Sequence, residues 1–263
     1  MAKKVKGKTT AKGIHGNPYF KLGKAKAKHD ARNLKLATIL RAPVALPKEY
    51  DFDTQHRTVP TPMFANDTYG DCVIAGRAHQ TMRFELIEQS KVLTIKDNDV
   101  TREYFKESGG ADSGLVVLDS LKEWRSKGWS VSGRKYKIKA FAQINQQDPD
   151  EVKRAVFLDI GAGMGLSLPK TAQAQIDAGK PWDAVNGSGS APNSWGGHYV
   201  YLSGYTATGP VCVTWGRKQQ MTWAFVNKYC DEAYAIIDAV NTAKKKRGLD
   251  QKKLNAFLES IKK

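Results

Sequence analysis

The segment that decides the fold is Asn66-Asp67-Thr68-Tyr69-Gly70-Asp71-Cys72, which leads into an apolar series at helical spacing: Val73, Ile74, Ala75, Ala78, Met82, Leu86 and Ile87. Gly70 and Asp71 provide a turn and a cap, so the series predicts a helix that begins after Cys72. A thiol at a helix start lies near the positive end of the helix dipole, which favours thiolate, although the adjacent Asp71 carboxylate opposes this. A lone cysteine is more often a small buried residue, so both interpretations of Cys72 stay open.

Helical patterns dominate the first half of the chain, and strand-like patterns dominate the second half. A short helix is predicted over 33–40, and further helices over 115–127 and from Asp148 through Phe157, with a strand over 137–144. Strand-like runs follow at 164–168, 199–205, 211–215 and 223–226, separated by glycine, proline and asparagine, and residues 234–240 close the body. This order predicts an α+β fold with two lobes.

His198 is the best candidate among five histidines for a base that pairs with Cys72. It follows Trp195-Gly196-Gly197 and precedes an apolar strand, which allows its side chain to project into a cleft. His79 lies seven residues after Cys72, and two helical turns, about 10 Å, are too far for a hydrogen bond to the thiol. A cysteine and a histidine far apart in sequence, each at the start of an element, form the pattern expected of a Cys/His nucleophilic pair. Taken alone, His198 would more often be a structural histidine.

Three motifs in this order resemble the papain-like cysteine peptidases: Asn66–Cys72 before a helix, Gly197-His198-Tyr199-Val200 before a strand, and Thr214-Trp215-Gly216. The resemblance covers about residues 46–240. It implies a papain-like two-lobe fold, with an N-terminal helical lobe and a C-terminal antiparallel, barrel-like β lobe. A cysteine peptidase, or a related hydrolase that transfers acyl groups, is the activity that it implies.

The resemblance also implies roles for individual residues. Cys72 is expected to be the nucleophile and His198 the base that takes its proton and later protonates the leaving amine. Asn66 occupies the position of the family's oxyanion-hole glutamine, and the backbone N–H of Cys72 would be the second donor. Trp215 corresponds to the tryptophan that shields the histidine from water. We expect Gly70, Gly197 and Trp215 to contact a polypeptide substrate.

One departure from the family pattern concerns the group that orients the histidine. The family places an asparagine two residues before the tryptophan, and here Val213 occupies that position. Thr214 is the nearest polar substitute and is included as a catalytic candidate, but on a strand it would point away from the face of Val213 and Trp215. Because losing the orienting group costs a triad orders of magnitude in rate, low activity is expected.

Positive charge is concentrated at the two ends of the chain, which carries a net charge of +16. Residues 1–41 contain 12 Lys and Arg against one acid, and residues 241–263 contain eight against two. We therefore expect a basic N-terminal arm over 1–41, mobile over 1–28, a papain-like domain over 42–240 and a basic helical tail over 241–263. In the stretch 248–263, Asp250 is expected to cap a helix that docks on the domain.

The basic ends are typical of proteins that bind nucleic-acid phosphates or line a capsid, and also of tails that only increase solubility. The candidate contacts are Lys3, Lys4, Lys6, Lys8, Lys244, Lys245, Lys246 and Arg247. Because the arms contain few aromatic residues, base stacking is not expected. A bacterial or bacteriophage protein, cytoplasmic or associated with a virion, would suit this distribution of charge.

Other patterns favour no cofactor, metal or membrane. No Cys/His cluster has zinc spacing, and no apolar run reaches the ~18 residues of a membrane span. Three cysteines are too few for a disulfide framework, which indicates a reduced compartment. Gly161–Gly165 is expected to form strand-edge glycines in a cleft wall, because it lacks the context of a dinucleotide-binding loop. Asp148–Glu151 and Asp231-Glu232 are interpreted as helix-terminal or solvated acids.

Two functional hypotheses remain. The leading one is a cysteine peptidase or related acyl-transfer hydrolase that uses Cys72, His198 and Asn66. The competing one is a catalytically weak or inactive structural or virion protein with the same fold, whose basic arms hold nucleic acid or a capsid partner. Val213 favours the second hypothesis.

Overall fold

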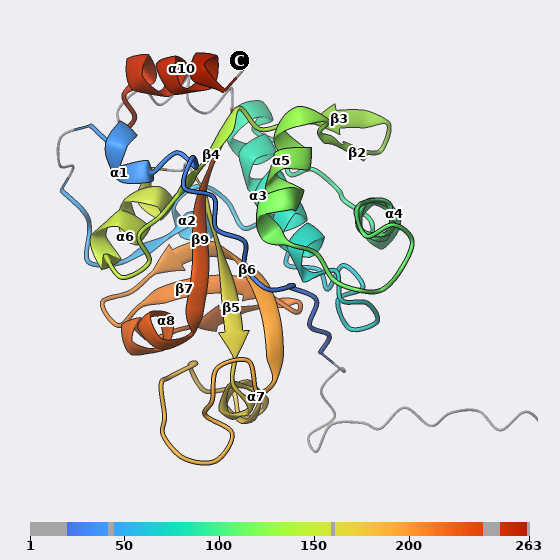
Figure 1. Cartoon of the computed structure of the whole chain (residues 1–263), viewed down its shortest axis with the longest axis vertical. Helices are drawn as coiled ribbons and strands as arrows, with labels where there is room; N and C mark the ends of the chain where they lie inside the picture. Colours follow the sequence, from blue (N-terminus) through green and yellow to red (C-terminus); the bar gives the residue numbers. More distant parts are fainter. Residues whose placement is uncertain (1–19, 42–44, 159–160, 239–247, 262–263) are drawn as a thin grey trace, which may run out of the picture.

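Two lobes face each other in the computed structural model, which describes residues 20–41, 45–158, 161–238 and 248–261 (Figure 1). The helical lobe contains α3 (Cys72–Gln89), α4 (Asp97–Glu107), α5 (Val117–Ser126) and a hairpin of β2 (Trp129–Val131) and β3 (Arg134–Tyr136). The other lobe is a sheet, and the remaining short helices are α1 (Leu36–Ile39), α2 (Phe52–Gln55), α6 (Pro149–Phe157), α7 (Lys170–Asp177) and α8 (Trp223–Tyr229). The predicted two-lobed α+β fold is confirmed.

The sheet contains seven antiparallel strands in the order β4-β9-β5-β6-β7-β8, with β1 paired to β6 as well. Their bounds are β1 (Tyr50–Asp51), β4 (Ala140–Gln143), β5 (Ala162–Leu168), β6 (Gly196–Tyr205), β7 (Pro210–Thr214), β8 (Arg217–Gln220) and β9 (Cys230–Ile237). Gly165 on β5 pairs with Tyr199 on one side and with Glu232 on the other. The strand that carries His198 and the strand that carries Glu232 therefore flank β5.

Helix α3 is buried from Cys72 to Leu86, although its sequence alternates apolar and polar residues. Its two buried arginines have partners on other elements. Arg77 lies 2.8 Å from Glu107 and donates to the carbonyl of Ser120, and Arg83 lies 3.1 Å from Asp53. Such paired burial is the condition under which charged groups are tolerated in a core. These contacts tie α3, which begins with Cys72, to α4, α5 and α2.

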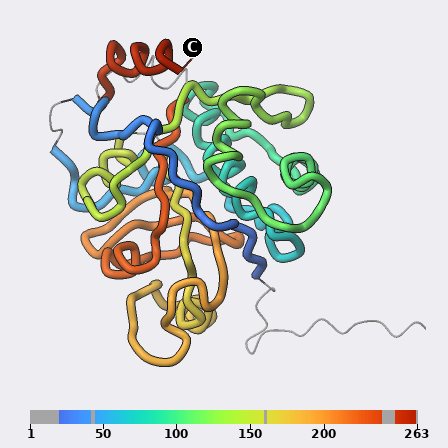
Figure 2. The backbone as a smooth tube through the Cα atoms, in the orientation of Figure 1, coloured from blue at the N-terminus to red at the C-terminus, as the bar shows by residue number. Residues whose placement is uncertain are grey.

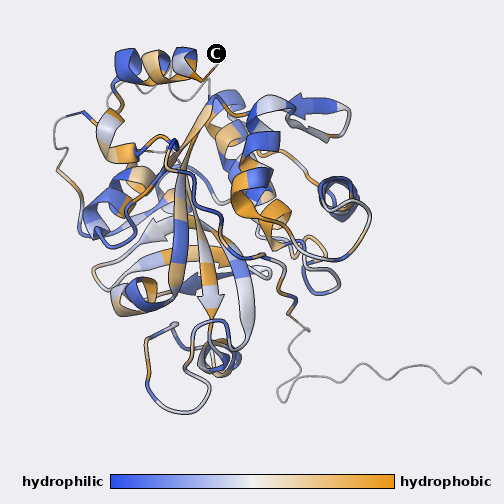
Figure 3. Cartoon of the chain, in the orientation of Figure 1, coloured by the Kyte–Doolittle hydropathy of each residue, from blue (hydrophilic) through white to orange (hydrophobic). Residues whose placement is uncertain are grey.

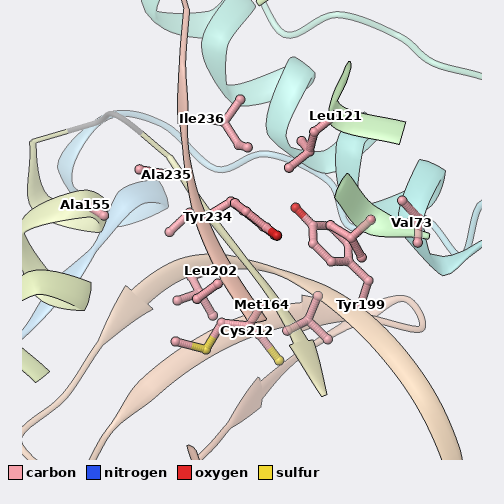
Figure 4. Packing of buried hydrophobic residues seen from close by; sticks show 14 of the residues in the cluster. Val73, Leu121, Ala155, Met164, Tyr199, Leu202, Cys212, Tyr234, Ala235 and Ile236 are labelled. Atoms are coloured by element: carbon pink, nitrogen blue, oxygen red, sulfur yellow. The ribbon is translucent and has the colours of Figure 1, made fainter. Parts of the chain in front are cut away.

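The glycines of β5 lie in the middle of the sheet, so the prediction that they form a strand edge is wrong. A Cβ on Gly163 would lie 1.8 Å from the hydroxyl oxygen of Tyr199. The absence of a side chain there lets the Tyr199 ring cross β5. Figure 4 shows the side chain of Tyr199 directed toward that of Tyr234, among the buried residues between the lobes. The segment does form a strand, as predicted, and not a phosphate-binding loop.

The run 223–226 is helix α8, so the prediction of a strand there is wrong. The hydroxyl of Thr222 accepts a hydrogen bond from the N–H of Phe225 at 3.0 Å, which caps the helix start. Phe225 and Val226 are buried by this helix. These apolar residues belong to the buried face of a two-turn helix. In a sequence segment this short, such a pattern cannot be distinguished from the alternation of a strand.

Both ends of the described chain pack against the body. Helix α10 (Gln251–Ser260) is capped by the Asp250 carboxylate and buries Leu254, and its alternating apolar and polar residues are visible in Figure 3. Leu249 pairs with Leu40, next to α1. The predicted cap and the docking of the C-terminal helix are confirmed. Among the described helices, none has both the length and the apolar character of a membrane span.

Candidate active site

Cys72 is the first residue of α3, at the boundary between the lobes, and only 1% of its surface is exposed. Burial raises the pKa of the Cys72 thiol to about 12, and hydrogen bonds from the backbone of Tyr199 and Gly23 oppose this shift. The thiol is therefore protonated at neutral pH in the conformation described here. Tyr199 belongs to the opposite lobe, so the sulfur lies where the two lobes meet.

His198 precedes Tyr199 on β6 and is fully buried. Its Nε2 lies 2.6 Å from the hydroxyl oxygen of Thr214, and its ring stacks on the indole of Trp215 with 3.9 Å between centroids. Its Nδ1 is buried and has no hydrogen-bond partner among the described residues. Burial lowers the pKa of His198 to about 3, so the imidazole is neutral.

The position of Thr214 corrects the prediction that its side chain would point away from the histidine. The pleat rule used for that prediction requires a continuous strand through Trp215. β7 ends at Thr214, and Trp215 has a φ of +40°, outside the extended region. Thr214 and Trp215 therefore contact the same imidazole, one through its hydroxyl and the other through its ring. Thr214, rather than Val213, holds the position that orients His198.

Tyr199 provides the connection between Cys72 and His198. Its backbone approaches the sulfur, and it is the next residue after the histidine. Within the described part of the chain, no hydrogen bond joins the Cys72 sulfur to the His198 ring. The two groups predicted from opposite halves of the sequence are thus adjacent to one shared residue, but they do not form an ion pair in this conformation.

Asn66 lies in the turn before α3 and is buried, and its amide donates a hydrogen bond to the carbonyl of Tyr69 at 3.0 Å. Its backbone carbonyl accepts from the N–H of Lys21. The turn that contains Asn66 includes two non-glycine residues with positive φ, Phe64 and Ala65. The amide expected to stabilise an oxyanion is therefore engaged within its own turn in this conformation.

Asp71 does not oppose the thiolate in the way that the sequence suggests. Burial raises the pKa of the Asp71 carboxyl to about 8, against hydrogen bonds from Asn66 and its own backbone. At neutral pH this carboxyl is mostly protonated, so it places little negative charge beside Cys72.

We expect Asp71→Asn to stabilise the protein at alkaline pH. The pKa of an ordinary aspartate is near 3.8, and that of folded Asp71 is about 8, so the folded state binds more protons between these values. Its free energy of unfolding falls as pH rises through that window. Because one pKa unit is worth about 1.4 kcal/mol, we expect the gain at about pH 9 to exceed the gain at about pH 5 by about 2 kcal/mol or more. Urea unfolding at the two pH values measures this, and an equal effect at both would contradict it.

The chain's own residues 20–28, here called the strap, run between the two lobes over this site (Figures 1 and 2). On the sheet lobe, the N–H of Lys24 donates to the carbonyl of Gly197 at 3.0 Å, and the indole N–H of Trp215 donates to the carbonyl of Lys21 at 3.1 Å. Phe20 stacks on Trp215 with 4.6 Å between centroids. The strap therefore contacts Gly197, which precedes His198, and Trp215, whose ring stacks on that of His198.

On the helical lobe, the strap pairs with Leu115, two residues before α5. The N–H of Leu115 donates to the carbonyl of Gly23, and the N–H of Ala25 donates to the carbonyl of Leu115. Gly23 packs so closely on Gly70 that a Cβ added to it would lie 1.6 Å from the Gly70 carbonyl oxygen. The prediction of a mobile arm is therefore wrong for residues 20–28, and residues 1–19 lie outside the described residues.

All three residues predicted to contact substrate contact the strap. Gly70 touches Gly23, the carbonyl of Gly197 accepts from Lys24, and the indole of Trp215 donates to Lys21. The structure thus brings these residues together around an extended polypeptide, but that polypeptide belongs to the same chain. The division of the chain at residue 41 stays a prediction, although residues 20–41 lie against the body.

Sequence reasoning missed the partners of Lys24. The side chain of Lys24 is 2% exposed, and its ammonium group lies 3.0 Å from Asp231 and 3.4 Å from Glu232. The interpretation of these acids as helix-terminal or solvated is wrong, because both lie in β9 and the Glu232 side chain is 2% exposed. Two adjacent acids in an otherwise apolar strand could have indicated a buried charged pair. Nothing in the sequence distinguished Lys24, its partner, from the neighbouring lysines.

The predicted nucleic-acid contacts cannot be placed. They are Lys3, Lys4, Lys6, Lys8, Lys244, Lys245, Lys246 and Arg247, all of which lie outside the described residues. Within the described ranges, no group of three or more His, Cys, Asp or Glu is arranged to bind a metal ion.

Solved structures of papain-like cysteine proteases match this chain. Xylellain, a cysteine protease from Xylella fastidiosa, superposes with a TM-score of 0.64 over 88% of this chain and 100% of its own, at 17% identity. A procathepsin B from Trypanosoma congolense gives a TM-score of 0.58 over 83% and 87%, at 11% identity. A Carica candamarcensis cysteine protease in complex with E-64 gives 0.53 over 73% and 99%, at 13% identity.

No protein-family model and no curated protein matches the chain. At these identities, the structural matches establish the fold alone. The chain has the papain-like fold that its three motifs predicted, with a helical lobe that carries Cys72 and an antiparallel sheet lobe that carries His198.

Proposed function

We propose that the protein is a papain-like cysteine peptidase, or a related Cys/His acyl-transfer hydrolase, that acts on polypeptides. The observation that carries this proposal is the arrangement of His198. One ring nitrogen lies against the Thr214 hydroxyl, the ring face lies on Trp215, and the other nitrogen is buried without a partner among the described residues. His79, the other buried histidine, also has an Nδ1 without a partner among the described residues, so the contacts with Thr214 and Trp215 are what distinguish His198.

The proposed reaction uses the free nitrogen as the base. When the Nε2–H of His198 donates to Thr214, Nδ1 is the basic nitrogen and takes the proton of the Cys72 thiol. The thiolate attacks the carbonyl carbon of a peptide bond, the C–N bond breaks, and the imidazolium returns the proton to the leaving amine. Water then hydrolyses the acyl-enzyme, with His198 again as the base. The N–H of Cys72 and the amide of Asn66, once released from Tyr69, would stabilise the oxyanion.

The conformation with the strap in place is the inactive one in this proposal. Both reacting groups are neutral beneath the strap, because burial raises the pKa of Cys72 and lowers that of His198. The strap also contacts Gly70, Gly197 and Trp215, the three residues expected to bind a polypeptide substrate. In this proposal it is a cover that a substrate has to displace.

Labelling by a peptidyl electrophile tests the proposal. The full-length protein is used with the substitution Gly23→Ala, which forces the strap away from Gly70. We expect mass spectrometry to find the label on Cys72, and not on Cys212 or Cys230, which are also buried free thiols. The additional substitution His198→Ala should prevent labelling. A label distributed over all three cysteines, or one independent of His198, would refute the proposed pair.

A second candidate function is a structural or virion protein that retains this fold without activity. The closed, neutral site favours it, together with the excess of positive charge at both ends. Its basic arms would hold nucleic acid or a capsid through salt-sensitive phosphate contacts. Unchanged biological activity of a Cys72→Ala protein would support this candidate. A bacterial or bacteriophage origin and a reduced compartment, consistent with free Cys72, Cys212 and Cys230, belong to either proposal.

A further inference from the structure

The strap places one side chain, that of Lys24, in a pocket of the sheet lobe beside the candidate active site. The Lys24 side chain is 2% exposed, and its ammonium group lies 3.0 Å from the Asp231 carboxylate and 3.4 Å from that of Glu232. It also donates to the carbonyl of Ala25 at 3.2 Å. A lysine is almost never buried to this extent unless it is paired with opposite charge.

The pocket is built by the central strands of the sheet. Gly165 on β5 pairs with Glu232 on β9, and a Cβ on Gly165 would lie 2.6 Å from both the Lys24 Cε and the Glu232 Cγ. The missing side chain therefore leaves room for the aliphatic part of a long basic residue. The hydroxyl of Ser167 donates to Asp231 at 2.8 Å and fixes that carboxylate at the end of the pocket.

The strap residue that approaches the Cys72 sulfur is the neighbour of the residue that fills the pocket. Gly23, which precedes Lys24, approaches Cys72 through its backbone, and the N–H of Lys24 is held by the carbonyl of Gly197, next to His198. A polypeptide bound between the lobes with the same backbone contact to Gly197 would direct a side chain into the same pocket. The strap thus shows which chemistry the pocket accepts.

We propose that Asp231 and Glu232 form a specificity pocket that selects a lysine or arginine side chain of the polypeptide substrate, next to the bond that is cleaved. This inference rests on the proposed peptidase function and names its substrate class. Asp231 lies at the partly exposed end of the pocket, whereas burial raises the pKa of Glu232 to about 7 and the Lys24 ammonium opposes that shift. A basic side chain therefore favours the ionised pair, an apolar side chain would leave both acids without a counterion, and an acidic side chain would add negative charge. A lysine or arginine side chain provides the positive charge that pairs with these acids, as Lys24 does.

A positional series of fluorogenic peptides tests the pocket on full-length Gly23→Ala protein. The peptides differ at one position at a time, which carries lysine, arginine, norleucine or glutamate. At one position, we expect lysine and arginine to give a kcat/KM about 100-fold above norleucine, in the range that unpaired polar groups produce. Lys24→Glu, which places a carboxylate against Asp231 and Glu232, displaces the strap by a second route and should give the same preference.

Neutralising the pocket should remove the preference. Asp231→Asn combined with Glu232→Gln should reduce the lysine-to-norleucine ratio of kcat/KM below about 10-fold, mainly through the loss for the lysine peptide. The matched control, Glu49→Gln, removes an exposed carboxylate ahead of β1 and should leave the ratio unchanged. Circular dichroism confirms folding of each variant. Hydrolysis with no preference at any position, or a preference that survives both neutral substitutions, overturns the inference.

Binding separates this inference from the proposed function. The same peptides are titrated into a Gly23→Ala, Cys72→Ala protein, and fluorescence anisotropy gives their Kd. Tighter binding of the lysine peptides without turnover in the Cys72 protein would support the pocket and refute the peptidase. Turnover by the Cys72 protein, with equal binding of the lysine and norleucine peptides, would support the peptidase and refute the pocket.

Discussion

Replacing Gly23 by alanine is expected to raise the rate at which iodoacetamide alkylates Cys72 by about 100-fold or more at neutral pH, because the fraction of thiolate controls that rate. A Cβ on residue 23 would lie 1.6 Å from the carbonyl oxygen of Gly70 and 2.2 Å from its carbon. Both atoms belong to the backbone of the turn before α3, so neither can rotate away. The strap has to leave, and its departure exposes the sulfur to water.

The size of the effect follows from the cause of the pKa shift. Burial is the largest contribution that raises the pKa of Cys72 to about 12. If the thiol returns to an ordinary value near 8.5, the thiolate fraction at neutral pH rises by about three orders of magnitude, and the lower nucleophilicity of a less basic thiolate reduces the gain. Cys212 and Cys230 are buried free thiols elsewhere in the sheet, so they contribute little background.

A second substitution in the strap serves as the control. Lys26→Ala removes one positive charge from an exposed position two residues beyond Lys24 and leaves Gly23 unchanged. It should alkylate at the wild-type rate. Equal rates for Gly23→Ala and the wild type, measured by mass spectrometry of the Cys72 peptide, would show that the strap does not protect the site.

The sequence was sufficient to predict the two lobes, and the structure places Cys72 in one and His198 in the other. Cys72 is the first residue of α3 and His198 the third of β6, and a turn signal precedes each of them in the sequence, so their positions follow from local pattern. Thr214 was less predictable, because its orientation depends on the positive φ of the following Trp215, a single departure from the extended conformation. Strand alternation carries no information about where a strand stops.

The strap was not predictable for a different reason. Its docking depends on Lys24 reaching Asp231 and Glu232, more than 200 residues later in the chain, and on two glycines, Gly23 and Gly165, that leave space for this contact. A run of lysines and alanines without apolar periodicity is typical of a solvated arm. Only the three-dimensional arrangement shows that one of these lysines is buried.

Replacing His198 by alanine is expected to lower peptide hydrolysis by about 10³-fold or more, since the base and its nucleophile act as a unit. The measurement compares kcat/KM of full-length Gly23→Ala protein with and without the second substitution. His79 on α3 is the matched control. It is also a buried histidine, and burial lowers its pKa to about 3 as well. If His79→Ala folds and retains activity while His198→Ala does not, the loss is specific to the proposed base.

The role of Thr214 follows from the same comparison. Thr214→Val keeps the shape of the side chain but removes the hydroxyl that lies 2.6 Å from Nε2 of His198. The ring stays on Trp215, so we expect a smaller loss than for His198→Ala, about 10- to 100-fold, mainly in kcat. Thr214→Ser restores the hydroxyl and should recover most of the rate. A hydroxyl both donates and accepts, whereas an asparagine carbonyl only accepts, so Thr214 permits either tautomer of His198. Equal activity of the valine and serine variants would mean that the stacking on Trp215 alone orients the base.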